Sequence, residues 1–227
     1  MTFHQQQQIK VINKIEQSIL QNSLNFSTVA PVDDFENDSR ICLTSLHFPN
    51  QKLIDDVQKI ISELKKVEPN FYYYPPQSLH LTIKNIRVIN DPPNFNQKDV
   101  EKAQQIFGEV ISKHKKFKIY FYRLLLFPNN LALVGTTDPE LDEIILDLDE
   151  KLNKAGIPDD KKYNNERYFF SNMTLARFSG LSPRFSSKVK ELSAKIELDP
   201  YEVDSVALVT GNAVFKNQKI IQRYNLL

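Results

Sequence analysis

The chain has 227 residues, of which 41% are apolar, and this is enough to bury a substantial core in one large domain. Its 29 Lys and Arg residues nearly balance its 28 Asp and Glu residues, so no overall positive field favours bulk binding to nucleic acid or to a membrane. A single cysteine excludes an internal disulfide framework, and we find neither a secretory signal nor an apolar run of membrane-spanning length. We therefore expect a soluble cytoplasmic protein in which any anionic ligand is held by a local site.

The N-terminal segment is predicted to be a helix followed by a connector. Within residues 3–20, isoleucines recur at the three- and four-residue steps of an amphipathic helix: Ile9, Ile12, Ile15 and Ile19. Residues 21–39 contain Asn, Ser, Pro and Asp without a period, which is typical of a connector. We assign residues 1–38 to this helix and connector, and residues 39–227 to the folded domain. We expect the helix to pack against that domain, with binding to a second copy or to a partner as the alternative.

A strand and a covering helix open the folded domain. Residues 40–48 predict the strand, and residues 51–66 carry apolar side chains at helical spacing opposite a charged, solvated face. An aromatic run, residues 71–74, follows. Aromatic rings just ahead of a polar strand can stack on any nucleobase, and they can equally pack in the core. Tyr73 and Tyr74 are therefore candidate substrate contacts, with burial in the core as the alternative.

The first stretch that suggests chemistry is Ser-Leu-His-Leu-Thr-Ile-Lys, residues 78–84. Side chains alternate along a strand, so His80, Thr82 and Lys84 are predicted to share one face while the apolar residues between them face the core. An imidazole and a hydroxyl two residues apart can reach one phosphate together, the hydroxyl as donor and the imidazole as donor or base. Lys84 would add a positive charge. A half-exposed strand histidine beside a strand-forming threonine, with no further role, is the alternative.

The middle of the chain is predicted to alternate between helices and strands. The expected elements are a helix at 97–114, two strands at 117–127 and 131–136 that form a hairpin, and a helix at 138–155. A charged loop, residues 159–167, then delivers the chain to a second informative stretch.

That second stretch is Ser-Asn-Met-Thr-Leu-Ala-Arg, residues 171–177, and it nearly repeats the first. Asn172 and Thr174 are predicted to share one face. By strict alternation Arg177 lies on the other face, from which it can reach a cleft at the strand end or pair with an acidic side chain. A short helix at 185–194 and strands at 203–210 and 214–224 complete the chain. The order of elements indicates an α+β domain built from two related halves.

Together the two stretches resemble the signature strands of the two-histidine (2H) phosphoesterase superfamily, which includes the 2'-5' RNA ligase-like proteins and cyclic phosphodiesterases. The family pattern is His-x-Thr/Ser twice, with the second copy often continuing as Thr-Leu-x-Arg. Residues 80–82 fit the first copy. Residues 172–177 fit the second, except that Asn172 stands where the family has its second histidine. The resemblance covers residues 39–227 and implies a two-lobed fold, with antiparallel sheets that form a central cleft and helices outside.

The resemblance also implies a metal-independent phosphodiesterase that acts on RNA ends, 2',3'-cyclic phosphates or oligonucleotides. In that chemistry one histidine takes a proton and the other gives one, while threonine hydroxyls hold the non-bridging oxygens. The residues that match the catalytic positions are His80, Thr82, Asn172 and Thr174. The candidate substrate-binding residues are Lys84, Arg177, Tyr73 and Tyr74. Because Asn172 can hydrogen-bond a phosphate but cannot exchange a proton near neutral pH, we expect the activity to be impaired or altered.

Two alternatives to an active enzyme stay open. The chain could be a catalytically inactive nucleotide- or RNA-binding module that uses the retained phosphate pocket, or a partner-binding protein with a vestigial site. We expect no cofactor and no catalytic metal, because the sequence has no His/Cys/Asp/Glu cluster at ligand spacing. The geometric prediction is that His80 and Asn172 face one cavity from neighbouring strands, with Thr82 and Thr174 flanking it.

Overall fold

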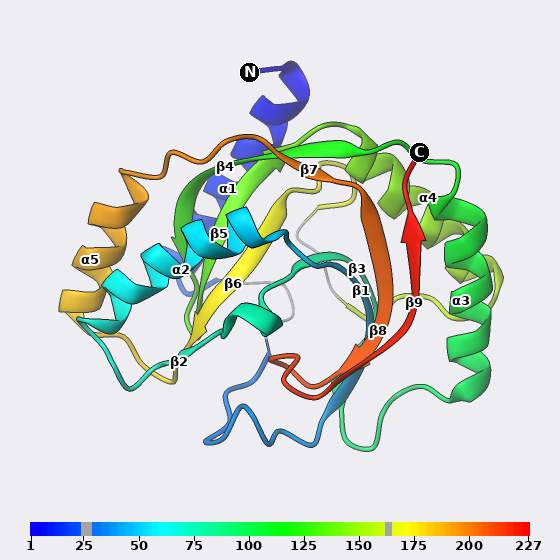
Figure 1. Ribbon diagram of the computed structural model, residues 1–227, viewed down its shortest axis with the longest axis horizontal. Coiled ribbons are helices and arrows are strands. Elements are labelled where there is room, and N and C mark those ends of the chain that lie inside the picture. The colour runs from blue at the N-terminus through cyan, green and yellow to red at the C-terminus, as the bar shows by residue number, and fades with distance from the viewer. Residues whose placement is uncertain (24–28, 162–164) are drawn as a thin grey trace.

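The computed structural model describes residues 1–23, 29–161 and 165–227, which form two antiparallel sheets with helices around them (Figure 1). Its helices are α1 (Phe3–Leu20), α2 (Gln51–Lys65), the short 3-10 helix η1 (Pro76–Ser78), α3 (Gln97–Ile111), α4 (Glu140–Lys154) and α5 (Pro183–Ser193). Its strands are β1 (Ile41–His47), β2 (Tyr72–Tyr73), β3 (Leu81–Asn90), β4 (Phe117–Leu126), β5 (Asn130–Thr137), β6 (Ser171–Arg177), β7 (Tyr201–Val203), β8 (Ser205–Gly211) and β9 (Gln218–Asn225).

The two sheets confirm the predicted α+β class. One sheet has the strand order β3-β1-β8-β9, the other has the order β2-β6-β5-β4-β7, and each motif strand lies in a different sheet. The prediction of a single strand at 203–210 is wrong, because the chain changes sheet at Asp204 and forms two strands, β7 and β8. Before this residue β7 pairs with β4, and after it β8 pairs with β1 and β9.

Each sheet is covered by helices whose apolar stripes follow the predicted spacing. In α2, for example, the N-cap Asn50 accepts a hydrogen bond from the backbone N–H of Leu53 at 3.0 Å. Its buried stripe is Leu53, Val57, Ile61 and Leu64. Helices α2 and α5 lie against the five-stranded sheet on one side of the molecule, and α3 and α4 lie against the four-stranded sheet on the other (Figure 1).

The N-terminal helix packs on its own chain, as predicted. Its side chains join a small apolar cluster with the faces of β4 and β5: Ile12, Ile15, Leu125, Ala132 and Val134. A buried amide strengthens this contact. Gln8 donates through Nε2 to the Thr137 hydroxyl at 2.7 Å and accepts the Thr137 backbone N–H at 2.8 Å. Helix α1 thus lies along β5, on the face that β5 shares with the polar residues of β6.

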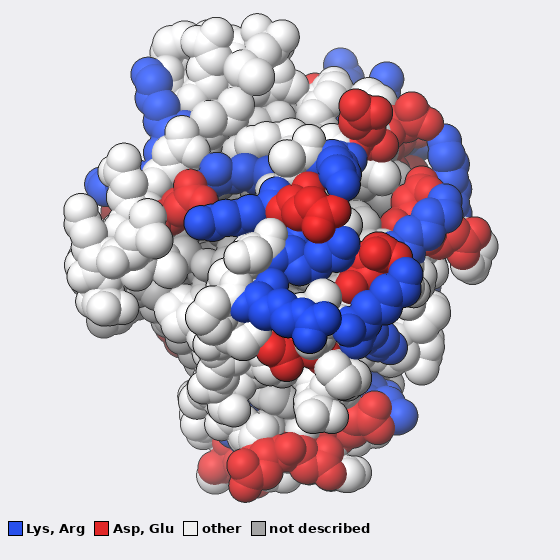
Figure 2. All heavy atoms as spheres, turned by 90° about the vertical axis from the view of Figure 1, so that its left-hand side faces the viewer, with Lys and Arg blue, Asp and Glu red and all other residues white. Residues whose placement is uncertain are grey.

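Charges of both signs are interspersed on the face that carries α2 and α5 (Figure 2). Lys188 of α5 lies 3.6 Å from Glu63 of α2, and several other pairs on this face link residues three or four apart in one helix. Such exposed pairs each contribute about 1 kcal/mol or less. In the described part of the chain, no helix has both the length and the apolar character needed to cross a membrane.

Candidate active site

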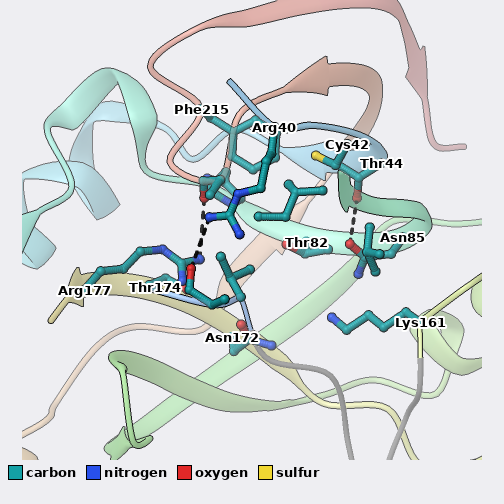
Figure 3. Close-up of a pocket in the computed structure, with 16 residues that line it drawn as sticks. Arg40, Cys42, Thr44, Thr82, Asn85, Lys161, Asn172, Thr174, Arg177 and Phe215 are labelled. Carbon is teal, nitrogen blue, oxygen red and sulfur yellow. Dashed lines mark hydrogen bonds between the residues drawn. The ribbon is translucent and has the colours of Figure 1, made fainter. Parts of the chain in front are cut away.

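A cavity of about 330 Å³ lies where β3 of one sheet approaches β6 of the other (Figure 3). Strands β1, β3 and β6 contribute to its wall, together with the segments that precede β1, β3 and β6 and the segment between β8 and β9. The polar residues that line it are Arg40, Cys42, Thr44, His80, Thr82, Asn85, Lys161, Asn172, Thr174 and Arg177.

The two motifs meet in this cavity. His80 immediately precedes β3, Thr82 is the second residue of β3, and Asn172 and Thr174 come from β6. The predicted shared cavity is present, but the two motif strands belong to different sheets and do not pair with each other. The roles of these residues in binding or catalysis remain predictions.

His80 is held as a neutral imidazole. Nδ1 lies 2.7 Å from the backbone carbonyl of Ser78, and because a carbonyl only accepts, Nδ1 carries the proton. The ring also packs edge-on against Phe215, with centroids 4.4 Å apart. Burial, opposed by the Ser78 hydrogen bond and helped by the charge of Arg177, lowers the pKa of His80 to about 4. Among the described residues none hydrogen-bonds Nε2, so its lone pair is available to a ligand.

Arg177 faces the cavity because the strand pairing shifts by one residue. Thr174 pairs with Ala132 of β5, but Ala176 pairs with the next residue, Leu131, so β6 accommodates one extra residue between them. This bulge reverses the alternation after Thr174. The expectation from strict alternation, that Arg177 lies on the opposite face, is therefore wrong.

The Arg177 guanidinium is buried beside neutral partners. Arg177 is only 7% exposed. Its Nε donates to the Tyr74 hydroxyl at 2.8 Å, and its Nη2 donates to the Ala213 carbonyl at 3.5 Å. No carboxylate among the described residues forms an ion pair with it, and residues 24–28 and 162–164 contain no Asp or Glu. A buried cation without an ion-pair partner is costly, so this one makes the cavity attractive to an anion.

No protein-family model matches the sequence, and no curated protein matches it. Solved structures match its fold. TT0787 of Thermus thermophilus has a TM-score of 0.55 at 13% identity, covering 82% of this chain and 97% of its own. Apo LigT of E. coli has a TM-score of 0.55 at 12% identity, covering 83% and 99%, and a phosphoesterase has 0.55 at 12%, covering 82% and 98%. The chain has the LigT fold.

Within this LigT fold, Lys84 does not reach the cavity. Thr82 and Lys84 pair with consecutive residues of β1, so β3 also contains a bulge, and it turns Lys84 away and brings Asn85 to the cavity wall. Lys84 is 1% exposed, and its ammonium lies 2.6 Å from both Asp149 and Asp159. The prediction that Lys84 binds substrate is therefore corrected: it ties β3 to α4 and to the segment after it.

Tyr73 and Tyr74 pack in the core, which was the alternative to stacking on a base. Neither lines the cavity. The Tyr73 hydroxyl donates to the Glu68 carbonyl at 2.9 Å, and the ring of Tyr74 is 1% exposed. Tyr74 still serves the site, because its hydroxyl accepts from Arg177 and donates to the Ala213 carbonyl at 3.1 Å.

Two basic residues of the cavity wall, Arg40 and Lys161, lie outside both motifs. Arg40, the residue just before β1, forms two hydrogen bonds to the carboxylate of Asp38, at 2.9 and 2.7 Å. Burial raises the pKa of Asp38, but these bonds and the charges of Arg40 and Arg177 outweigh it and hold the pKa below its usual value. Lys161 comes from the charged loop before β6. Neither Arg40 nor Lys161 has a periodic signal in the sequence, and a basic residue at a strand start or in a loop is normally solvated, so only the folded chain reveals them.

The remaining histidines of the sequence have other partners. His47 Nδ1 lies 2.8 Å from the Ser205 carbonyl, and its Nε2 lies 2.8 Å from the Tyr201 hydroxyl, so its ring belongs to the packing of β1. Across the described ranges, no three or more His, Cys, Asp or Glu side chains gather in a way that could hold a metal ion.

Proposed function

We propose that this protein is a 2H-type phosphodiesterase that acts on a nucleotide phosphodiester, either a 2',3'-cyclic phosphate, an RNA end or an oligonucleotide. The observation that carries this proposal is the buried guanidinium of Arg177, which has no ion-pair partner among the described residues, in the same cavity as His80 and the two threonines. An anion with several oxygens is the ligand that the guanidinium and the two threonine hydroxyls can bind at once. E. coli LigT, which has the same fold, has been crystallised with phosphate and with 3'-AMP, and this supports a phosphate group as the anion.

His80 suits the role of general base. Its pKa of about 4 means that the imidazole is neutral above that pH, and Nε2 then takes a proton from an attacking water or ribose hydroxyl. The bound phosphate anion raises this pKa toward the working pH, because a nearby negative charge favours the imidazolium. Thr82, Thr174 and Arg177 would hold the non-bridging oxygens and the charge that develops on them.

Asn172 favours a second candidate function, a receptor that binds a nucleotide without turnover. Its amide can donate to a phosphate oxygen, but it cannot supply the proton that a leaving alkoxide needs. Loss of one positioned acid typically lowers a rate by ~10²–10⁴-fold. A phosphate pocket that keeps its donors and loses its acid would bind well and react slowly.

The test is turnover of a 2',3'-cyclic nucleotide in the presence of EDTA, with His80→Ala as the comparison. The enzyme is expected to hydrolyse the substrate under these conditions and to lose at least ~10²-fold of its rate in the variant. Equal rates for the two proteins would refute the phosphodiesterase. In that case a thermal shift with 3'-AMP that Arg177→Met abolishes identifies the receptor, and no shift in either protein excludes both functions.

A further inference from the structure

The wall of the cavity that contains His80 also carries a lysine, Lys161, that neither motif contains. Lys161 extends into the cavity with its amine directed toward Asn172 (Figure 3). Asn172 occupies the position at which the resemblance places the second proton-transfer group. Lys161, from the segment before β6, therefore approaches the position at which the second histidine of the family pattern is missing.

The backbone of Lys161 is fixed on β3. The Asp159 carboxylate accepts the Lys161 backbone N–H at 2.6 Å through one oxygen and binds the Lys84 ammonium at 2.6 Å through the other. The neighbouring carboxylate of Asp160 accepts the backbone N–H of Val88 at 2.7 Å. These contacts anchor the segment before Lys161 to β3, the strand that contains Thr82 and directly follows His80. The buried ion pair of Lys84 therefore has a clear consequence: it positions Lys161.

Lys161 is also the group in the wall best suited to give up a proton. The two lining arginines, Arg40 and Arg177, are not candidates, because a guanidinium group does not act as a proton donor in proteins. Burial raises the pKa of the Cys42 thiol to about 12, and its Sγ donates to the Gly211 carbonyl at 3.2 Å. His80 is the base in the proposed reaction. Among the described lining residues, Lys161 is then the titratable cation that remains.

The surroundings of Lys161 adjust its acidity in the useful direction. Burial is the largest influence and lowers the pKa of its ammonium. The Asp159 carboxylate raises the pKa, the positive charges of Lys84 and Arg177 lower it, and the Cys42 thiol raises it. An acid works best when its pKa lies near the working pH, so a lysine with a lowered pKa is a better proton donor than an exposed one. A bound phosphate then favours the protonated form that donation requires.

We propose that Lys161 is the general acid of this site and that it replaces the histidine missing at position 172. The inference rests on the proposed phosphodiesterase function. In the step, His80 Nε2 takes the proton of the attacking water as its oxygen bonds to phosphorus. The bond from phosphorus to the ribose oxygen breaks, its electron pair stays on that oxygen, and Lys161 Nζ supplies the proton. His80 ends protonated and Lys161 neutral, and exchange with solvent restores both.

The test compares two substrates and two variants. Ribose oxygen is a poor leaving group that needs an acid, whereas p-nitrophenolate leaves without one. For Lys161→Arg, which keeps the charge but cannot release a proton, kcat on a 2',3'-cyclic nucleotide is expected to fall by ~10²–10⁴-fold. On a p-nitrophenyl phosphodiester the same variant is expected to stay within about tenfold of the parent. Lys161→Met is expected to lose the same factor on the cyclic substrate and also to raise KM on both substrates, because the charge is gone.

A rescue experiment separates proton donation from charge or structure. Adding Asn172→His to Lys161→Arg returns a proton donor to the site, so the double variant is expected to regain at least ~10-fold of kcat on the cyclic substrate. In the parent, kcat on the cyclic nucleotide is expected to decline at alkaline pH as Lys161 loses its proton. This decline is not expected on the p-nitrophenyl substrate or in Lys161→Arg. Thermal unfolding of each variant checks that the variant is folded. If a variant does not fold, the decline of the parent's kcat at alkaline pH on the cyclic nucleotide still tests the proposal.

Equal losses on both substrates in Lys161→Arg, or no loss on either, would overturn the assignment. These outcomes differ from a failure of the proposed function. If His80→Ala matches the parent, the phosphodiesterase itself is refuted and the inference falls with it. If turnover depends on His80 but not on the acidity of residue 161, the enzyme stands and only the role of Lys161 is wrong.

Discussion

Replacing Arg177 with Met should leave the ligand-free protein as stable as the parent, or more stable. The parent buries a guanidinium without a carboxylate partner among the described residues, and an effective penalty of several kcal/mol attaches to such a buried ion. Met has a similar length and carries no charge, so it removes that penalty. The hydrogen bonds lost are those to Tyr74 and Ala213, which keep the 3.1 Å bond between their own oxygens. The expected change in unfolding free energy lies between zero and about 2 kcal/mol of stabilisation.

The same substitution should remove most of the anion binding. Hydrogen bonds to a charged group contribute about 1.5–3 kcal/mol, which corresponds to roughly 10- to 150-fold in affinity. The assay is thermal unfolding with and without a large excess of inorganic phosphate or 3'-AMP. The parent is expected to gain stability as the logarithm of the ligand concentration, and the variant is expected to show little gain.

Arg40→Met is the matched control, because Arg40 lines the same cavity but already has a carboxylate partner. Its loss leaves the buried carboxylate of Asp38 without that partner, so we expect a destabilisation of about 1–3 kcal/mol without ligand. The two arginine variants should thus differ in the sign of their stability change. A loss of several kcal/mol in ligand-free Arg177→Met would refute the reasoning, since it would mean that Arg177 is a structural cation.

Three further substitutions test the remaining electrostatics of the site. The pKa of His80 is about 4 in the folded chain and 6.5 when unfolded, so the unfolded state binds more protons between these values. The free energy of unfolding is therefore expected to decrease by roughly 2 kcal/mol as the pH is lowered from 7 to 5. Urea unfolding of His80→Gln should lack this loss, and a pH dependence equal to that of the parent would show that the imidazole is not buried as a neutral group. Lys84→Met strands two carboxylates and should cost about 3–5 kcal/mol in denaturant unfolding, whereas a neutral result would mean that hydration replaces the ion pair. Tyr74→Phe removes the hydroxyl that accepts a hydrogen bond from Arg177 and should weaken phosphate binding by roughly tenfold. The control is Tyr73→Phe, which removes a hydroxyl outside the cavity and should leave the phosphate affinity unchanged. Equal effects of the two substitutions would argue against this role of Tyr74.

The sequence determined the local part of the site. A strand places alternate side chains on opposite faces, so His80 and Thr82 had to share one face, and so did Asn172 and Thr174. The apolar residues between them fixed which face is buried, and the helical spacing of apolar residues in α2 predicted the stripe that this helix buries. In α1 the same spacing predicted the buried Ile12 and Ile15 but not the buried Gln5 and Gln8. These features depend only on neighbours within a few residues.

Tertiary structure decided which cations serve the site. A bulge depends on how a strand pairs with its neighbour, and one bulge in each motif strand turned Lys84 out of the cavity and Arg177 into it. Whether a buried cation is neutralised depends on residues far along the chain, as with Lys84, whose acidic partners are Asp149 and Asp159. Lys161 reaches the cavity because Asp159 meets β3, a contact that no local pattern encodes. Alternation is a property of the single strand, whereas register and charge pairing are properties of the assembled sheets, and only the latter could complete this site.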